Sequence, residues 1–270
     1  MTVIVADIGA SNARFALLTK GKLSDIYQFS CDDFKNPEGM IASFKNAYAP
    51  KASALIIGVA GAVIDDKVCW TNRPWQLKVD RLKKKLALKK IILKNDVEVQ
   101  CMALPCLKPK DFCVLQKGNV SAAPKALLSL GTGVGAAYYW DKMAFATEYG
   151  QTLLDSGVPL EKILHHLPAN LGSVFGTKRK SKQQISCQEF YQKLAYIVRN
   201  FVLTLKPCGG LYLYGGMLDF DMLKKERFVP QVIVHPTMCS FLKSVPIYLI
   251  KQEHLAFIGL KELARKYGLS

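Results

Sequence analysis

The sequence has few acidic residues and no long apolar run. Of 270 residues, 21 are Asp or Glu and 37 are Lys or Arg, so the formal net charge is +16. Charged or polar segments interrupt every apolar stretch before it could span a bilayer, and no basic segment precedes the first one. Half of the residues are hydrophobic, which excludes disordered and low-complexity classes. We therefore expect a globular cytoplasmic protein without membrane contact.

The cysteines lack the spacing of a metal site. The sequence has eight cysteines and four histidines, but no Cys-x-x-Cys pair and no His-x-x-x-His partner. In a cytoplasmic protein, scattered cysteines in apolar surroundings are typical of reduced, buried thiols. His165 and His166 are adjacent, so they would point to different faces of a helix.

The positive charge is divided among short clusters at 81–90, 178–182 and 223–226. None of these clusters alternates with aromatic residues, and no nucleic-acid-binding module is present. This pattern favours a solvated basic face, and we expect no nucleic-acid partner. Binding to nucleic acid or to an anionic surface stays open as an alternative that depends on charge alone. Attraction of a polyphosphate substrate by the positive field is a further interpretation.

Apolar, β-rich runs alternate with segments of helical period, which predicts an α/β architecture. The runs that predict strands are VIVADIG, FALL, ALIIGVAGAV, KKIILKND, ALLSLG, GAAYYW, GGLYLYGG, VPQVIV and VPIYLIK. The segments that predict helices are Pro37 to Tyr48, Val79 to Leu88, Val97 to Leu107, Cys187 to Leu205 and the last fifteen residues.

A weak internal repeat predicts two similar domains. Residues 3–18 and 126–140 share one plan, which is a strand, a tight turn of small residues and a second strand. The P-loop and the dinucleotide fingerprint differ because their glycine turns lead into a helix. We therefore predict two hairpins whose backbone amides face an anion. The expected domains are residues 1–97 with 255–270, which form a small domain closed by the C-terminal helix, and residues 98–254.

Both hairpins carry residues suited to phosphate binding. Asp7 ends the first strand, where a carboxylate would repel phosphate unless a cation lay between them, so this position predicts Mg²⁺ held through water. The alternative is a turn aspartate that caps a backbone amide. In the second hairpin, Gly131, Gly133 and Gly135 allow close approach of the backbone to a ligand, and Thr132 adds a hydroxyl donor.

Further polar residues lie where apolar segments end. Asn95 and Asp96 end the apolar strand KKIILKND at 89–96, and a carboxylate there is suited to act as general base toward a substrate hydroxyl. An Asx helix cap is the alternative, and both roles are compatible. Glu148 and Glu161 suit the adjacent hydroxyls of a sugar, although each alone is more typical of the surface.

The order of these motifs resembles the bacterial glucokinase family, a branch of the actin-like, sugar-kinase and heat-shock-chaperone ATPase superfamily. ADIGASNARFALL is similar to the family's first phosphate hairpin, an Asp, Gly, Gly, Thr, Asn, Ala, Arg pattern. The other similar segments, in family order across nearly the whole chain, are GVAGAV at 58–63, TNRPW at 71–75, LKND at 93–96, LGTGVG at 130–135 and GGLYLYGG at 209–216.

The resemblance implies two ribonuclease-H-like domains that face a central cleft, and phosphorylation of a hexose at its terminal hydroxyl by ATP with Mg²⁺. It implies that Asp96 is the general base and that Asp7 orients Mg²⁺. The sugar contacts it implies are Asn95, Asp96, Glu148, Gln151 and Glu161. The nucleotide contacts it implies are Asp7, Gly9, Ala10, Ser11, Asn12, Gly131, Thr132, Gly133, Gly135, Gly215 and Gly216.

Four positions depart from the family pattern. Ala10 replaces a glycine, and its methyl group would be strained at a positive φ angle; Ser11 replaces a threonine and keeps the hydroxyl. Gln151 stands where the family has a histidine, and HHLP after Glu161 replaces a Ser-Gly-x-Gly turn. These departures favour, as the alternative, a catalytically weakened sugar-binding or regulatory protein of the same fold. The hexose, the donor and a homodimeric state stay open.

Overall fold

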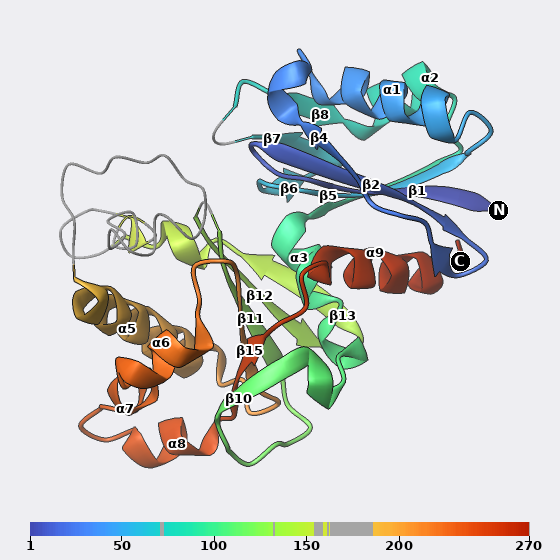
Figure 1. The fold of residues 1–270 in the computed structure, drawn as a ribbon. Helices are drawn as coiled ribbons and strands as arrows, with labels where there is room; N and C mark the ends of the chain where they lie inside the picture. Colours follow the sequence, from blue (N-terminus) through green and yellow to red (C-terminus); the bar gives the residue numbers. More distant parts are fainter. Residues whose placement is uncertain (71–72, 132, 154–158, 161, 163–185, 270) are drawn as a thin grey trace. The chain divides into compact units, whose positions relative to one another are not determined.

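The computed structural model describes residues 1–70, 73–131, 133–153, 159–160, 162 and 186–269. The chain divides into two compact units, which are Met1–Cys106 with Glu253–Ser270, and Leu107–Gln252. Each unit contains its own mixed sheet of six strands (Figure 1). None of the helices in the described part of the chain has the length and apolar content needed to cross a membrane.

The sheet of the first unit begins with a hairpin. Its strand order is β3-β2-β1-β5-β9, and β4 also pairs with β2. β1 runs antiparallel to β2 and parallel to β5, which is parallel to β9. A separate three-stranded sheet has the order β6-β7-β8. The strands are β1 Thr2–Ile8, β2 Asn12–Thr19, β3 Lys22–Leu23, β4 Tyr27–Ser30, β5 Ala54–Val59, β6 Val63–Ile64, β7 Lys67–Cys69, β8 Gln76–Lys78 and β9 Lys90–Asn95.

Helices cover both faces of the first sheet, with α1 and α2 on one side and α3 and α9 on the other (Figure 1). All six residues of β5 are buried, as expected for a strand covered on both faces. On the α1 side, Phe15 of β2 stacks on Phe44 of α1 with ring centroids 4.8 Å apart. The helices are η1 Cys31–Asp33, α1 Pro37–Tyr48, α2 Val79–Leu86, α3 Asp96–Cys101, η2 Leu104–Cys106 and α9 Leu255–Lys266.

The sheet of the second unit repeats this plan. Its order is β10-β15-β14-β11-β12-β13. β11 forms an antiparallel hairpin with β12, β13 follows β12, and β14 and β15 extend the sheet in parallel on the other side of β11. The strands are β10 Phe112–Gln116, β11 Lys125–Leu130, β12 Val134–Trp140, β13 Met143–Thr147, β14 Leu211–Tyr214 and β15 Ile247–Ile250.

The long helix α5 supplies the main apolar face against this second sheet. The Ser186 hydroxyl accepts a hydrogen bond from the Glu189 amide at 3.1 Å and caps the helix. Phe190, Leu194 and Phe201 recur at helical spacing and are buried in one cluster with β11 and β14. The helices are η3 Pro109–Asp111, η4 Tyr149–Gln151, α5 Cys187–Leu205, α6 Phe220–Lys225, α7 Phe228–Val232 and α8 Cys239–Ser244.

The structure confirms both predicted hairpins, and it confirms the helices 37–48 and 187–205 with their predicted ends. The strand predicted at 229–234 is wrong, because this segment lies largely in α7. Phe228 and Val232, four residues apart, are fully buried against the core of the second unit. A helical turn brings both side chains to one face, and Pro230 is tolerated in the first turn of a helix.

The helix predicted at 97–107 is also wrong in its length. α3 ends at Cys101, and a separate 3₁₀ turn follows at Leu104–Cys106. Pro105 has no N–H group to continue the helical hydrogen bonds. The Ala103 amide already bonds to the Gln100 carbonyl at 3.1 Å, a three-residue step that begins the tighter turn.

The cysteines are less buried than the sequence predicted. All eight lie in described residues, and none forms a disulfide. Cys31 and Cys101 are buried, whereas Cys69 and Cys106 are exposed. Cys69 ends β7, a strand of the small three-stranded sheet, where only the central residue Val68 is buried. The surrounding apolar residues therefore do not predict the burial of that thiol.

Two glycines allow α3 to pack closely against its neighbours. A Cβ atom at Gly58 in β5 would lie 3.2 Å from the Val99 Cγ2 atom and 3.5 Å from the Asp96 Cα atom. A Cβ atom at Gly259 in α9 would overlap the Val99 carbonyl oxygen. α3 is therefore packed tightly between β5 and α9, at a separation that leaves little room for a side chain at Gly58 and none at Gly259.

We predict that Gly259→Ala destabilises the protein by about 3 kcal/mol, because the new methyl group must displace the backbone of α3. Alanine is the better helix former by about 1 kcal/mol, so a net loss would isolate the effect of the clash. Chemical denaturation measures the change. Lys261→Ala, an exposed substitution in α9, is the control and should have little effect; unchanged stability of Gly259→Ala would contradict the close packing.

Candidate functional site

The turn of the first hairpin is short and closed by its own backbone. β1 ends at Ile8 and β2 begins at Asn12, and the Gly9 amide donates to the Asn12 carbonyl at 3.0 Å. Ala10 does not have a positive φ angle. The methyl group that replaces the family's glycine is therefore free of the backbone strain considered from the sequence. Ser11 and Asn12 are exposed and available to a ligand.

Asp7 lies one residue before the end of β1, between two strands. It is directly opposite Arg14 in β2 and pairs with Gly58 in β5. Desolvation raises the pKa of the Asp7 carboxyl from 3.8 to about 6, and the Arg14 charge only partly offsets this effect. A carboxylate held in such surroundings is typical of functional sites.

Asn95 and Asp96 join β9 to α3. The Asn95 side-chain oxygen caps α3, since it accepts from the Val97 amide at 2.9 Å and the Glu98 amide at 3.1 Å. The Asn95 side-chain amide donates to the Gly61 carbonyl at 3.0 Å. The helix-cap interpretation is thus confirmed for Asn95, whose oxygen is already used within the protein.

Asp96 is the first residue of α3 and is half-buried. One of its oxygens accepts from the Val97 amide at 2.9 Å. Ile8, Val59 and Asn95 occupy matching positions in the three parallel strands β1, β5 and β9. Neighbouring strands are about 4.8 Å apart, so the backbones of Ile8 and Asn95 are separated by about 10 Å at one sheet edge. The structure therefore brings Asp96 to the same edge as the first turn.

The second hairpin turn is bordered by two other predicted segments. The Gly131 amide donates to the Gly133 carbonyl at 3.1 Å, and a Cβ atom at Gly131 would meet nothing within 4 Å. At Gly215, which has a φ of +130°, a Cβ atom would overlap the Leu130 carbonyl oxygen. The end of β14 therefore packs directly on the backbone of this hairpin, and Gly216 follows in the same turn. Gly135 pairs with Ser129 within the hairpin ladder.

Glu148 precedes the 3₁₀ turn η4 and Gln151 is its last residue, and both are exposed. The Gln151 amide donates to the Glu148 carbonyl at 2.9 Å. Gly150 is buried where a Cβ atom would overlap the Val134 carbonyl oxygen. The Tyr149 hydroxyl donates to the Ile197 carbonyl of α5 at 2.9 Å, and burial raises the pKa of this hydroxyl. The contacts of Gly150 and Tyr149 therefore hold η4 in place, and the side chains of Glu148 and Gln151 lie beside the second hairpin.

Two of the predicted site residues, Thr132 and Glu161, lie outside the described residues, as do Thr71 and Asn72 of the TNRPW segment. The other predicted residues fall into two groups. Those of the first unit gather at the carboxyl ends of β1, β5 and β9. Those of the second unit gather around the turn of β11 and β12.

Sequence reasoning missed Arg73. This side chain donates to the Ala10 carbonyl in the first hairpin turn, to the Cys31 carbonyl and to the Asp32 carboxylate. Arg73 is 63 residues from Ala10 along the chain, and no spacing rule connects them. The only signal in the sequence was the position of this arginine within TNRPW at 71–75, a segment chosen because it is similar to a family motif and not because of the arginine.

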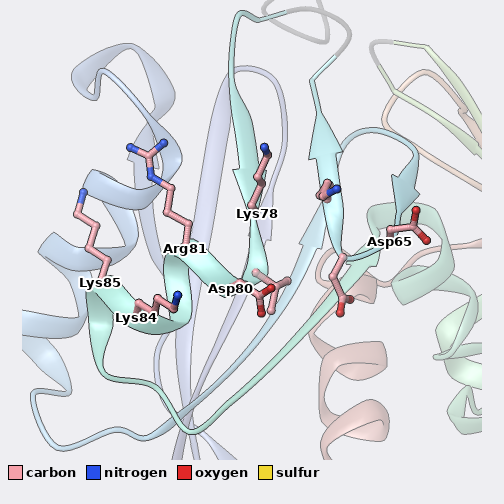
Figure 2. Close-up of a pocket in the computed structure, with 9 residues that line it drawn as sticks. Asp65, Lys78, Asp80, Arg81, Lys84 and Lys85 are labelled. Atoms are coloured by element: carbon pink, nitrogen blue, oxygen red, sulfur yellow. The ribbon is translucent and has the colours of Figure 1, made fainter.

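A separate cavity of about 620 Å³ in the first unit contains none of the predicted site residues. Lys78, the residue before α2, and residues of the helix itself line one part of it (Figure 2). Apart from the buried Val79, its side chains are exposed and of both charges, which fits the solvated basic surface expected from the cluster at 81–90. Its lining residues are Asp65, Asp66, Lys67, Lys78, Val79, Asp80, Arg81, Lys84 and Lys85.

Comparison with known proteins identifies the fold. The glucokinase from an Antarctic psychrotroph matches with a TM-score of 0.76 at 21% identity, covering 98% of this chain and 99% of the other. A ROK family glucokinase from Streptomyces griseus, in complex with glucose and AMPPNP, matches with a TM-score of 0.66 at 14% identity, covering 98% and 100%. The two hairpin-first sheets thus define the class: this is the actin-like fold of sugar kinases.

The sequence then places the chain within that class. The profile of the glucokinase family matches residues 4–178 and 167–267. The glucokinase of Paramagnetospirillum magneticum is 26% identical, and the alignment covers 97% of each chain. The protein belongs to the glucokinase family, and it is an ATP-dependent hexose kinase by class.

The raised pKa of Asp7 predicts a trade-off between stability and function. Because the folded chain keeps a proton that the unfolded chain releases between about pH 4 and pH 6, the stability from Asp7 falls as pH rises through this interval. Asp7→Asn cannot ionise, so without ligands it should stabilise the protein by about 2–3 kcal/mol above pH 6 and little at about pH 4.

Thermal melts across this pH range measure the Asp7→Asn effect. Asp25→Asn is the control, because it makes the same change at an exposed position of the same unit. A melting temperature of Asp7→Asn that follows the wild type at every pH would contradict the proposed burial of the charge.

Proposed function

We propose that the protein transfers the γ-phosphate of ATP to the 6-hydroxyl of glucose or a closely related hexose, with Asp96 as general base. The position of Asp96 carries this proposal. Its carboxylate begins α3 at the carboxyl end of β9, at the sheet edge that also presents the turn Gly9–Asn12. Family membership supports hexose phosphorylation, and the shared edge supports a base placed near bound phosphate.

In this reaction the Asp96 carboxylate accepts the proton of the sugar hydroxyl. The hydroxyl oxygen then bonds to the γ-phosphorus as the bond from that phosphorus to the β–γ bridging oxygen breaks. The products are the sugar phosphate and ADP, and the proton leaves Asp96 for solvent. General base catalysis of this kind contributes about 10²- to 10⁴-fold to the rate, and positioning of the two substrates contributes further.

The residues present fit Mg²⁺ as a nucleotide-bound ion. Among the described residues, no group of three or more His, Cys, Asp or Glu side chains could hold a metal by itself. Mg²⁺ commonly keeps several waters and takes one or two protein carboxylates together with substrate phosphates, so the single Asp7 carboxylate suffices. When bound, Mg²⁺ neutralises charge on the phosphates, and Asp7 would orient it, either directly or through water.

The remaining assignments extend the same proposal to the second unit. Glu148 and Gln151 would hold sugar hydroxyls from either end of η4, with Glu161 and Asn95 as further sugar contacts. For the nucleotide, the turn Gly131–Gly135 would bind phosphate, and Gly215 and Gly216 would lie against the adenosine. The Streptomyces griseus structure contains glucose and AMPPNP, which supports both ligands for this chain.

The alternative function, a sugar-binding or regulatory protein with weakened catalysis, keeps two of the sequence departures that favour it, because HHLP after Glu161 lies outside the described residues. Gln151 still replaces the family's histidine. The unstrained backbone at Ala10 removes another reason to doubt phosphate binding. The geometry therefore supports the active kinase better.

We predict that Asp96→Asn lowers kcat for glucose phosphorylation by about 10²- to 10⁴-fold, while glucose still binds. Asparagine keeps an oxygen that can accept from the Val97 amide, so α3 should fold. An assay of ADP formation measures turnover, and calorimetry measures glucose binding. Glu98→Gln is the control, since it changes a carboxylate of the same helix, which pairs with Lys94 of β9, without changing the base. Full activity of Asp96→Asn would exclude this residue as the base.

A second prediction concerns the acceptor oxygen. 6-Deoxyglucose lacks the 6-hydroxyl but keeps the other hydroxyls, so it should bind with an affinity within about 10-fold of that of glucose and yield no sugar phosphate. The measurement is ADP release with glucose and with the analogue, beside calorimetry for each. Phosphorylation of 6-deoxyglucose would place the acceptor at another hydroxyl. Tight glucose binding without ADP release would support the regulatory alternative.

A further inference from the structure

Arg73 connects the first hairpin turn to a neighbouring segment. Its side chain is 18% exposed and lies with its guanidinium carbon 4.9 Å from the centre of the Trp75 ring. The Nε atom donates to the Ala10 carbonyl, Nη1 donates to the Cys31 carbonyl at 3.2 Å, and Nη2 pairs with the Asp32 carboxylate. The planar guanidinium group thus donates hydrogen bonds to three different oxygen atoms, and it also lies over the ring of Trp75.

The carbonyl groups of the turn are held one after another. The Gly9 carbonyl lies 3.7 Å from the Cys31 thiol sulfur, which can donate to it. The Ala10 carbonyl accepts from Arg73, and the Ser11 carbonyl accepts from the Cys31 amide at 2.9 Å. Three successive peptide units are therefore fixed by Cys31 and Arg73.

This arrangement also fixes where the amide groups point. Within a trans peptide unit the N–H group is directed opposite to the C=O group. Anchoring the carbonyls of Gly9 and Ala10 therefore directs the N–H groups of Ala10 and Ser11 away from Cys31 and Arg73. Among the described residues these two amides have no acceptor. Successive amides presented in this way form an anion-binding site.

We infer that Arg73 is a positioning residue for nucleotide binding: it orients the amides of Ala10 and Ser11 toward phosphate by holding the carbonyl of Ala10 from behind. This inference rests on the proposed function of the first hairpin. It differs from a direct role of the Arg73 charge, because the guanidinium group is already bonded to three protein oxygens.

Two substitutions of Arg73 distinguish the effect of its hydrogen-bond geometry from the effect of its positive charge. Arg73→Lys keeps the positive charge but replaces the planar group that bonds in three directions, whereas Arg73→Gln also removes the charge. Asp32→Asn is a milder change, because it removes only the exposed ion pair that helps to orient Arg73. Arg81→Gln is the matched control, since it removes one arginine charge at an exposed position of the same unit, together with an ion pair to Glu38 at 3.9 Å.

The experiment measures the affinity for AMPPNP with Mg²⁺, the affinity for glucose, the KM for ATP and the melting temperature of each variant. We expect Arg73→Lys and Arg73→Gln to weaken nucleotide binding by about 10-fold or more, since hydrogen bonds to a charged ligand depend on alignment. Asp32→Asn should weaken nucleotide binding less, by about 2- to 5-fold. Glucose affinity should stay within about 2-fold in all variants, and Arg81→Gln should match the wild type.

Several outcomes would overturn the inference. Wild-type nucleotide affinity in Arg73→Lys would show that charge is sufficient. Equal loss of glucose and nucleotide affinity with a lower melting temperature would show a general structural role. If the wild type binds AMPPNP but phosphorylates no hexose, the proposed function fails while nucleotide affinity still tests Arg73; a wild type that binds no nucleotide would overturn both.

Discussion

The close packing of α3 is the constraint on which the candidate site of the first unit depends. Helices α3 and α9 cover one face of the sheet, and two glycines, Gly58 and Gly259, bring α3 against β5 and α9. Since Asp96 begins α3, the packing of this six-residue helix sets the position of its carboxylate. A helix this short has little stability of its own, so tertiary packing must supply it. The position of the proposed base thus depends on close contacts of two glycines with α3, through the Val99 side chain at Gly58 and through the Val99 carbonyl group at Gly259.

A second constraint is the burial of charge. Asp7 occupies a strand position where burial raises its pKa to about 6, and the sheet would be more stable with a neutral residue there. Proteins commonly keep such destabilising groups where function requires them. The Mg²⁺ ion of a bound nucleotide would supply the positive charge that Arg14 alone does not fully provide. If Asp7 orients Mg²⁺ as proposed, stability and ligand binding are coupled through this one carboxylate.

The parts of the fold that could be predicted from sequence are those set by local patterns. The two hairpins and the helices 37–48 and 187–205 follow from strand–turn–strand patterns, helical periodicity and cap residues such as Asn36 and Ser186. The segment 229–234 misled because a short apolar run fits a strand or a buried helix equally well. In the candidate site, the cap role of Asn95 was predictable from its position before a helix. The contact of Arg73 with Ala10 was not, because it depends on how distant segments pack.

The described residues at the two hairpin turns are held in place by different means. In the first turn, the side chains of Cys31 and Arg73 hold the carbonyls from outside. In the second, Gly150 and Gly215 allow the backbone of the protein to pack directly on the strand ends at Val134 and Leu130. A turn held by side chains can tolerate Ala10 in place of glycine, because its conformation does not require a positive φ angle. A turn held by backbone contact has no such freedom, since any Cβ atom at Gly150 or Gly215 would overlap a carbonyl oxygen. Although the two units repeat one strand plan, the first turn therefore accepts a non-glycine residue at position 10, whereas the second hairpin requires glycine at positions 150 and 215.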